Sequence, residues 1–450
     1  MSDQKSLALK IIYTLHENGY EAYLAGGCVR DQLLEKEPKD YDIATNALPD
    51  SIENLFSKTT AIGKSFGTIV VIEHNESIEV TTFRSEGTYH DGRHPEKVTF
   101  SSAKEDASRR DFTINGLFYD PIKNNIIDHV NGKVDLKNNL VKAIGDPNDR
   151  FKEDHLRMMR AIRFAHTLDF KIEDKTKYAI QENAHLISKI SIERIENELS
   201  RILVESKRPG DALQTLYDVG LLKHILPEVV ELIGIKQPPN HHPEGDVFTH
   251  VKLMLNHTSS SKILETFFLR ELCYVVLFHD ISKPEKYIEE LQDDGTVRIR
   301  FLGHEKRGAE VTKSILQRLK LSNQDTKKIV SVIADHMKPF QSKDMKLSTL
   351  RKMMGSSYFD LLLELHRLDG LGSKGILPSY TFLKEKLNEF ENILPRPLIS
   401  GDDLSTLGIE NGIKMGKIIE QTYDKQLEEN LSKQELLDWM KEKFGAESGT

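Results

Sequence analysis

The sequence predicts an α+β protein with a mixed-sheet head followed by mainly α-helical domains. Two observations support this fold class. Runs rich in β-branched residues, GTIVVI at residues 67–72 and SIEVTTF at 77–83, occur early in the chain, and helical spacing of apolar residues takes over from about Asp149. The length of 450 residues allows two to four domains, each large enough to bury its own core.

Composition excludes several classes of protein. The 38% hydrophobic content excludes a disordered chain, and no apolar run is long enough to cross a bilayer, so we expect no membrane partner. The opening MSDQKSLALK lacks the parts of a secretory signal, which predicts a cytoplasmic protein. Cys28 and Cys273 are read as reduced thiols. No protein partner is evident.

The charge balance gives no sign of a nucleic-acid partner. The chain has 62 Lys and Arg against 70 Asp and Glu, a net charge of -8. Any anionic partner would therefore have to be held by local basic patches.

The first elements of the predicted head can be read in order. Leu7, Ile11, Ile12 and Leu15 recur at helical spacing, Gly19 ends that helix, and residues 20–25 form a short strand. GGCVRD, DYD and the two β-branched strands follow. A small α+β domain at residues 1–148 fits this mixture.

Helical periodicity organises the rest of the chain. It begins with RFKEDHLRMMRAIRFAHTL and continues through SIERIENELSRILVES, where Ser191 can cap the helix. Prolines 238, 239 and 243 indicate a linker, and PRP at 395–397 a last boundary. The predicted domains are a head at 1–148, a helical region at 149–236, a helical histidine-rich domain at 237–394 and a tail at 395–450.

Three acidic residues of the head form a candidate metal site. Asp40 and Asp42 stand two positions apart, so in an extended segment both point to one face, where they repel unless a cation lies between them. Glu79 lies in the middle of a strand candidate, where an apolar residue or Thr would be usual. Three such carboxylates could hold two Mg²⁺ ions for phosphoryl transfer, although DYD alone is more often a solvated turn.

A glycine turn and an arginine cluster indicate a phosphate partner. Gly26 and Gly27 free backbone N–H groups that can approach a phosphate before the helix start VRDQLL, and Arg30 adds a cation. In SRRDFTING, at residues 108–116, arginine can fork onto phosphate and aspartate can accept from ribose hydroxyls. Taken alone, this second motif could also be an ion-paired helix start.

These motifs resemble one known family. GGCVRD, DYD, RRDFTIN and EDHLRMMRAIRF occur in the order found in class II tRNA nucleotidyltransferases, the CCA-adding enzymes, and in their bacterial poly(A) polymerase relatives. The resemblance implies a polymerase-β-like nucleotidyltransferase head, a base-selecting and RNA-binding role for residues 149–236, tRNA as partner, and CTP and ATP as substrates. It implies Mg²⁺ at Asp40 and Asp42, with Glu79 as third catalytic carboxylate. The nucleotide-binding residues that it implies are Gly26, Gly27, Arg30, Arg110, Asp111, Asn115, Asp154, Arg157, Arg160 and Arg163.

Asp154 and Arg157 suit the reading of a base edge. Three residues apart on a predicted helix, they share a face. A carboxylate accepts from an exocyclic amine and a guanidinium donates to a ring nitrogen or carbonyl, so the pair can accept cytosine and adenine and refuse uracil and guanine. An isolated pair of this kind is more often a surface salt bridge. On the same helix, Arg163 should face well away from Asp154.

The loop SEGTYHDGRHPEK, between Arg84 and Val98, is polar and bears glycine, which predicts an exposed mobile segment. In the family, a loop here accompanies addition of the terminal A, so its presence argues against an enzyme that adds only C. It does not separate a full CCA-adding enzyme from an A-adding specialist or a poly(A) polymerase.

A second set of residues resembles an HD metal-dependent phosphohydrolase domain. His279 and Asp280 follow the apolar run LCYVVLF, near the expected end of a buried helix. A lone histidine is more often a hydrogen-bonded core residue, but here several ligand types recur. The resemblance implies the ligands His250, His279, Asp280 and Asp369, with His304 and His336 in addition. Imidazole and carboxylate together suit Mn²⁺, Ni²⁺, Co²⁺ or Mg²⁺, so a second divalent metal is expected.

Lys283 and the C-terminal segment are the last two features with an assigned role. Lys283, in HDISKP, supports a live phosphate site, and an alternative of a different class is an HD phosphohydrolase with a nucleotide-sensing head. The segment from Pro397, with glycines 408, 412 and 416, resembles the family's tRNA-binding tail.

Overall fold

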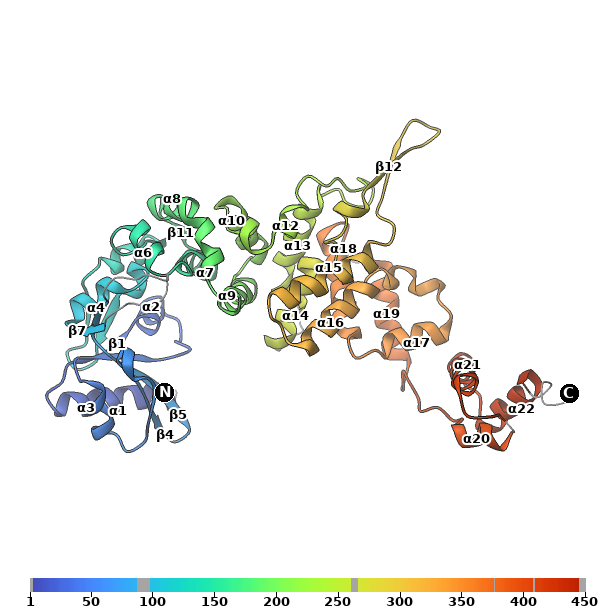
Figure 1. Cartoon of the computed structure of the whole chain (residues 1–450), viewed down its shortest axis with the longest axis horizontal. Coiled ribbons are helices and arrows are strands. Elements are labelled where there is room, and N and C mark those ends of the chain that lie inside the picture. Colours follow the sequence, from blue (N-terminus) through green and yellow to red (C-terminus); the bar gives the residue numbers. More distant parts are fainter. Residues whose placement is uncertain (1–2, 87–97, 260–265, 376, 408, 445–450) are drawn as a thin grey trace. The chain divides into compact units, whose positions relative to one another are not determined.

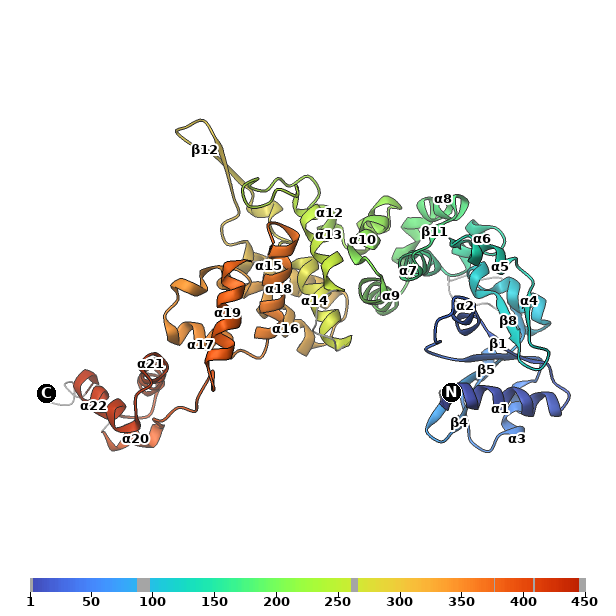
Figure 2. The ribbon, with the colours of Figure 1, turned by 180° about the vertical axis from the view of Figure 1, so that it is seen from behind.

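The computed structural model describes residues 3–86, 98–259, 266–375, 377–407 and 409–444. Figure 1 shows these elements along the chain, and Figure 2 shows them from behind. The chain divides into two compact units, Met1–Val230 and Glu231–Thr450. The predicted linker of prolines 238 to 243 follows this division directly, in a segment without helix or strand. The other two predicted boundaries, at 148/149 and 394/395, lie inside the units and stay predictions.

A seven-stranded sheet forms the base of the first unit, in the order β3-β4-β5-β2-β1-β8-β9. Strands β2 and β5 run parallel, and the other neighbouring pairs are antiparallel. The sheet is therefore mixed, as predicted. Its strands are β1 (Ala22–Ala25), β2 (Asp42–Thr45), β3 (Thr59–Gly63), β4 (Thr68–Glu73), β5 (Glu76–Thr82), β8 (Leu117–Asp120) and β9 (Asn125–Asp128).

Two helices cover one face of this sheet. Helix α1 (Asp3–Glu17) contacts β1, β2 and β5, and α3 (Pro49–Leu55) contacts β4, as Figure 2 shows. The predicted apolar stripe of α1 is buried in the same core as Ile43, Ile69 and Val80 of the sheet. The helix and the three strands predicted from residues 1–83 are thus confirmed, with strand ends within a residue or two of those expected.

Shorter elements complete the head. They are α2 (Gly27–Leu33), the pair β6 (Arg84–Glu86) and β7 (Val98–Phe100), α4 (Ala103–Arg109), a 3-10 turn at Thr113–Asn115, and α5 (Gly132–Lys137). The loop predicted between Arg84 and Val98 falls mostly on residues 87–97, outside the described part of the chain.

Helices follow the head within the same unit. They are α6 (Pro147–Glu153), α7 (Arg157–Leu168), α8 (Asp174–Asn183), α9 (Ile192–Glu205), α10 (Pro209–Asp218), α11 (Leu222–Ile225) and α12 (Pro227–Val230), with a small parallel pair of β10 (Leu140–Val141) and β11 (Lys171–Ile172). Ser191 stands at the N-cap of α9, but its side chain makes no capping hydrogen bond there.

The expectation that Asp154 and Arg157 lie on one helix is wrong. Asp154 ends α6 with φ -138 and ψ 105, values outside a helix, and Arg157 is the first residue of α7. The Asp154 side chain accepts from the backbone N–H of Leu156 at 3.1 Å. Aspartate favours this kind of local bond, which interrupts a helix and starts the next one.

The second unit is mainly helical. Its larger part contains α13 (Val247–Thr258), α14 (Thr266–Phe278), the hairpin β12 (Ile288–Leu291) and β13 (Val297–Arg300), α15 (His304–Arg318), α16 (Asn323–Asp335), α17 (Leu347–Met354), α18 (Phe359–Gly372) and α19 (Pro378–Glu389). Residues 272–278 of α14 are fully buried, so this helix is the centre of the unit. No helix among the described residues is long and apolar enough to cross a membrane.

The last helices form a small cluster. They are α20 (Gly401–Thr406), α21 (Ile413–Glu429) and α22 (Lys433–Phe444). Their apolar side chains, among them Leu404, Ile418 and Leu436, make a separate core. This segment corresponds to the predicted tail.

Candidate functional site

The sheet brings the three head carboxylates together. Asp42 is the first residue of β2 and Glu79 lies in β5, and the two are direct partners across this parallel pair. Asp40 lies two residues before Asp42, and all three side chains are exposed. Glu79 stands between the buried Ile78 and Val80, so the pleat turns it away from the core and toward Asp42.

The electrostatics of this group fit a divalent cation. Asp42 is open to solvent, but the protein atoms around it displace part of its water. This partial desolvation, with the nearby charges of Glu79 and Asp40, raises the pKa of Asp42 to about 6, although Arg110 acts in the opposite direction. Carboxylates that raise one another's pKa are stabilised by a cation between them. Because the donors are all carboxylate oxygens, they suit a hard ion such as Mg²⁺.

Gly26 lies beside these carboxylates because β1 pairs with β2, which places Ala25 opposite Asp42. Its φ of 72° is in the left-handed region, and a Cβ there would meet the guanidinium of Arg110 at 2.8 Å. Only glycine therefore fits without strain or displacement of Arg110. Gly27 follows as the first residue of α2.

A buried chain of polar contacts links α2, the 3-10 turn and α7. Arg30 donates to the side-chain oxygen of Asn115 at 2.7 Å, and Asn115 donates to Asp111 at 3.1 Å. Arg160 forks onto the other oxygen of Asp111 at 2.6 and 2.9 Å. Burial would raise the pKa of Asp111, but Arg160 and Asn115 lower it to about 2. Asp111 is thus a fixed anion between elements.

Asp106 is a site residue that sequence reasoning missed. It is buried in α4, and its two carboxylate oxygens accept from Arg109 at 2.7 Å and Arg110 at 3.1 Å. One carboxylate therefore orients both arginines of the RRD motif. The spacing of Asp106 three and four residues before these arginines is the sequence signal that could have indicated it.

Phe164 is a second missed residue. Its ring lies 5.2 Å from the Arg30 guanidinium, 5.3 Å from that of Arg160 and 4.3 Å from that of Arg163. An aromatic face attracts such cations. Arg163 is buried in an ion pair with Glu198 at 2.6 Å.

Asp154 and Arg157 are each held by other residues. Arg194 of α9 donates to both oxygens of Asp154, at 2.9 and 3.2 Å. Arg157 donates to Glu153 at 2.6 Å and to the backbone oxygen of Arg109 at 3.2 Å. The two side chains therefore have fixed positions although they do not share a helix. Arg194 was not predicted, because its contact joins residues far apart in sequence.

One cavity of about 670 Å³ collects all the catalytic and nucleotide-binding residues predicted for the first unit. The carboxylates lie on its sheet side and the arginines on α2, α4 and α7. The predicted residues in its wall are Gly26, Gly27, Arg30, Asp40, Asp42, Glu79, Arg110, Asp111, Asn115, Asp154, Arg157, Arg160 and Arg163.

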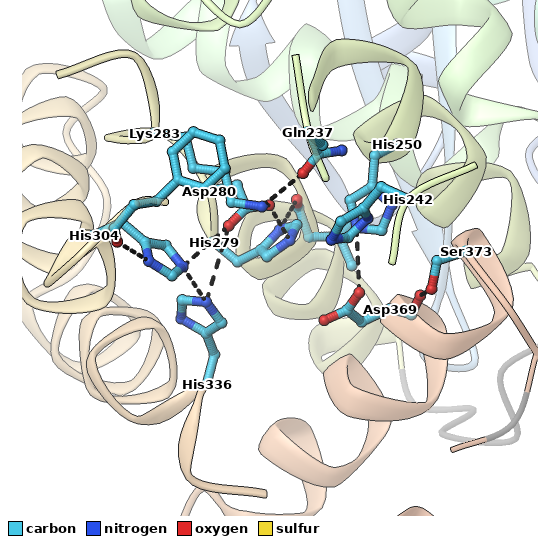
Figure 3. A network of polar contacts seen from close by, with 12 residues as sticks. Gln237, His242, His250, His279, Asp280, Lys283, His304, His336, Asp369 and Ser373 are labelled. Carbon is cyan, nitrogen blue, oxygen red and sulfur yellow. Dashed lines mark hydrogen bonds and ion pairs between the residues drawn. The ribbon is translucent and has the colours of Figure 1, made fainter. Parts of the chain in front are cut away.

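The predicted histidines of the second unit also come together (Figure 3). Nε2 of His250 lies 3.3 Å from Asp369, and Nε2 of His279 lies 3.1 Å from Asp280. Nε2 of His304 lies 3.4 Å from Asp280. His250 comes from α13, His304 from the start of α15 and Asp369 from α18, while His279 and Asp280 directly follow α14, as predicted.

The other ring nitrogen of each of these histidines has its own acceptor. Nδ1 contacts the backbone oxygens of Val276, Phe301 and Ile333 in His279, His304 and His336, at 2.9, 2.8 and 2.7 Å. Such bonds place the proton on Nδ1 and leave Nε2 as the ligand atom.

Glu244 provides the acceptor for His250. One of its carboxylate oxygens lies 2.7 Å from Nδ1 of His250 and 2.8 Å from Nδ1 of His242. Glu244 was not predicted, because nothing in its local sequence distinguishes it from a surface glutamate.

These residues fit a metal ion. Two groups of three residues each have ligand atoms within 4.8 Å of one another. One group is His250, His279 and Asp280, and the other is Asp280, His304 and His336, so Asp280 belongs to both. All five are buried, and Nε2 of His250 and of His279 faces a carboxylate, that of Asp369 or Asp280, without forming a hydrogen bond of good geometry. Burial, then the neighbouring His279 and His304, lower the pKa of His336 to about 3, so its ring is neutral, as a ligand must be.

A second cavity opens beside this centre. It has a volume of about 630 Å³, and its wall includes Asp280, His304, His336 and Asp369. The buried Lys283 also lines it and donates to Asp280 and to Gln237, both at 2.7 Å (Figure 3).

The mixed sheet with paired carboxylates, a glycine turn and a cationic wall defines the head as that of a nucleotidyltransferase. Residues 22–142 match the family model "Poly A polymerase head domain", and residues 169–232 match "Probable RNA and SrmB-binding site of polymerase A". The first unit of this chain is therefore similar to the head and RNA-binding domains of poly(A) polymerases and to CCA-adding enzymes.

Known relatives agree with this assignment. The chain is 48% identical over 223 residues to the CCA-adding enzyme of Ligilactobacillus salivarius, with 49% of this chain and 55% of the relative covered. It is 48% identical over 204 residues to that of Bacillus pumilus, with 45% and 51% covered. The chain thus spans about half the length of the curated relatives that it matches.

Solved structures cover the whole chain. The CCA-adding enzyme of Bacillus stearothermophilus in complex with CTP is 26% identical, with a TM-score of 0.72 and 99% of each chain covered. The Thermotoga maritima CCA-adding enzyme complexed with tRNA is 20% identical, with a TM-score of 0.62 and coverage of 97% and 95%, and shows a shared fold.

Proposed function

We propose that the protein is a cytoplasmic tRNA nucleotidyltransferase. It adds C, C and A, or the terminal A, to the tRNA 3′ end from CTP and ATP, depends on Mg²⁺ and uses no nucleic-acid template. The observation that carries this proposal is the single cavity that holds three carboxylates, the Gly26 turn, the arginines and the Asp154 and Arg157 pair. The relatives named CCA-adding enzymes support it.

The carboxylates supply the catalytic part of the cavity. Asp40 and Asp42 hold Mg²⁺, which when bound offsets the charge that develops on the triphosphate. Glu79, paired in register with Asp42, helps to activate the tRNA 3′-hydroxyl. Their positions follow from β2 and β5, so the sheet orients the reacting groups.

The opposite wall holds the nucleotide. Gly26 and Gly27 let the triphosphate approach the backbone, and Arg30 and Arg110 donate to its oxygens. Asp111 and Asn115 lie where ribose hydroxyls are received, and Arg160 and Arg163 add positive charge. Asp111 reaches the ribose while Arg160 stays on its second oxygen.

Base choice depends on Asp154 and Arg157. The carboxylate accepts from the amino group of cytosine or adenine, and the guanidinium donates to the adjacent acceptor. Arg194 and Glu153 hold the two side chains in place. The same pair refuses UTP and GTP, whose edges present the opposite pattern.

An A-adding specialist and a poly(A) polymerase would use the same cavity. Incubation with tRNA lacking CCA, tRNA ending in CC and unstructured RNA, each with a single labelled NTP, separates them on one gel. A CCA-adding enzyme labels the first with CTP and the second with ATP. Labelling of unstructured RNA with ATP would indicate poly(A) polymerase instead.

The role of the carboxylates has its own test. Asp42→Ala should abolish incorporation and leave tRNA binding nearly intact, because Asp42 contributes charge and not fold. Asp50→Ala, which removes an exposed carboxylate from α3, is the matched control and should remain active. Loss of tRNA binding in Asp42→Ala, with catalysis preserved on excess tRNA, would contradict the assignment.

A second function is favoured by the histidine cluster. We propose that His250, His279, Asp280, His304, His336 and Asp369 hold a divalent transition metal in an HD-type phosphohydrolase site. The convergence of Nε2 atoms whose Nδ1 partners are already fixed is the observation that supports it. Metal content after dialysis against Mn²⁺, and hydrolysis of bis(p-nitrophenyl) phosphate, test the site. His279→Ala should lose both.

The alternative of a different class makes this site the main activity and the head a nucleotide sensor. It is distinguished by the same gel, because a sensor binds CTP or ATP without extending any RNA. Incorporation by the wild type that His279→Ala retains would exclude this alternative.

A further inference from the structure

We infer that the cavity beside the metal centre takes the end of a single-stranded oligonucleotide chain, and that Arg298 and Arg300 of β13 hold phosphates of that chain behind the reacting one. The inference rests on the proposed phosphohydrolase function and names its substrate class. The chain's terminal phosphate ester would lie at the metal ligands.

The cavity has more cations in its wall than one phosphate needs. Lys283 is buried beside Asp280, at the metal centre. Arg298, Arg300 and Lys374 line the same cavity. One terminal phosphate is served by the metal ligands and Lys283, so the two arginines have charge to offer to further phosphates.

The hairpin spaces these arginines for successive phosphates. Arg298 and Arg300 are two residues apart in a strand, so they point to one face at a separation of roughly 7 Å. Figures 1 and 2 show that the hairpin of β12 and β13 extends away from the helices of its unit. A chain that starts at the metal centre can therefore follow β13 outward.

The charge of Arg298 is not neutralised within the protein. Arg298 is exposed and makes no ion pair with any residue that the structure describes. Glu290 of β12, which lies opposite Arg298 in the hairpin, contacts Arg300 at 3.4 Å, and the side chains of Arg300 and Glu290 are over one third exposed. Pairs of this kind contribute little, so both guanidiniums are available to an anion.

Aromatic side chains in the same wall suit the bases of such a chain. Phe301 directly follows β13, and Phe340 is 41% exposed, and both line the cavity. Bases stack on such rings without sequence preference, as in other single-strand binding sites. A small phosphate ester would use neither the rings nor the arginines.

The experiment compares two probes with the full-length, Mn²⁺-loaded protein. One is bis(p-nitrophenyl) phosphate, and the other is a pentaribonucleotide with a 3′-phosphate. In the oligonucleotide reaction a water oxygen bonds to phosphorus, the ester P–O bond breaks, and a water proton leaves with the 3′ oxygen. The products are orthophosphate and a 3′-hydroxyl.

The test variant is Arg298→Ala/Arg300→Ala, and the control is Lys313→Ala/Lys327→Ala. The control removes the same charge from exposed positions of α15 and α16 that do not line the cavity. We expect the test variant to lower kcat/KM for the pentaribonucleotide at least tenfold, through KM, and to leave hydrolysis of the small ester within twofold. The control should leave both probes unchanged.

Binding gives a readout that does not depend on turnover. Fluorescence anisotropy of the labelled pentaribonucleotide in chelator, at several salt concentrations, should show a slope of log Kd against log salt that is about 1.4 shallower in the test variant, the value for two lost phosphate contacts. An unchanged slope, or an equal effect on both probes, would overturn the inference. If neither probe is hydrolysed with any metal, the proposed phosphohydrolase function fails, and the slope still decides the inference.

Discussion

At the scale of single residues, position 26 is the place in the head where a side chain is least tolerated. It combines a positive φ with a guanidinium that a side chain would strike. The two effects can be separated, because Gly19 has a φ of 81° and nothing within 4 Å of its Cβ position. Substitutions at Gly19 and Gly26 therefore distinguish the effect of backbone strain from the effect of displacing Arg110 in the nucleotide site.

Gly19→Ala should destabilise the protein by about 1 kcal/mol because of its positive φ, and Gly26→Ala by at least about that much, since the φ of 72° and ψ of -123° at Gly26 lie outside the regions that alanine occupies. Only Gly26→Ala displaces Arg110, so only this variant should raise KM for CTP, by tenfold or more. Urea unfolding and single-nucleotide incorporation check the two effects. Equal KM values in both variants would show that Arg110 does not bind the triphosphate.

Glu244 allows a residue-scale prediction in the metal centre. Glu244→Gln keeps the size of the side chain but weakens the acceptor for His250, so Mn²⁺ affinity should fall roughly 10- to 100-fold. Isothermal titration of the metal-free protein with Mn²⁺ measures this. Glu385→Gln, at an exposed position of α19, is the control and should bind as the wild type does. Unaltered affinity in Glu244→Gln would mean that His250 is not a ligand.

At the scale of elements, the break between α6 and α7 decides where the base-selecting side chains lie. Asp154 bonds to the backbone of Leu156 and is gripped by Arg194 from α9. A continuous helix would have pointed Asp154 along the α7 face. Because of the break, the Asp154 carboxylate lies between α6 and α7 and is held by Arg194 of α9.

Arg194→Ala should release Asp154 and leave it free to rotate. We expect incorporation of C and A to fall at least tenfold with a raised KM for both nucleotides, while tRNA binding stays. Steady-state incorporation at varied NTP concentration measures the change. Arg208→Ala, which removes an exposed arginine at the start of α10, should have no such effect. A tRNA-binding defect alone would assign Arg194 to RNA contact instead.

The elements also show what sequence can and cannot predict. Helix α1, strands β4 and β5 and the position of His279 after α14 follow from local periodicity, and the structure has them. Asp106, Phe164, Arg194 and Glu244 were missed. Phe164 and Arg194 act across distant segments and Glu244 has no distinguishing local pattern, whereas the spacing of Asp106 before two arginines was a signal that went unused. The break at Asp154 was missed because apolar spacing continues through it, although aspartate's preference for helix starts was a signal.

At the scale of the whole molecule, the two candidate sites lie in separate compact units, and each set of ligands comes from its own unit. A ligand that binds only the folded state stabilises the unit that holds it. The two sites should therefore respond separately to substitution.

Calorimetry with and without Mn²⁺ tests this separation. In the wild type, Mn²⁺ at 100 times its Kd should stabilise the histidine-bearing unit by about 2.7 kcal/mol. His279→Ala should abolish that shift and retain nucleotide incorporation, whereas Asp42→Ala should retain the shift and lose incorporation. A variant that loses both would show that the units depend on each other.

The contacts that fix Asp154 and Arg157 have a consequence for the order in which C and A are added. The fixed pair recognises only the features that cytosine and adenine share. Its conformation is therefore the same whether no, one or two nucleotides have been added. The count, and the change from one base to the other, must then be carried by something that alters at each step. In the proposed reaction, only the RNA 3′ end changes at each step. The length of that end must therefore determine which nucleotide is added next and when addition stops.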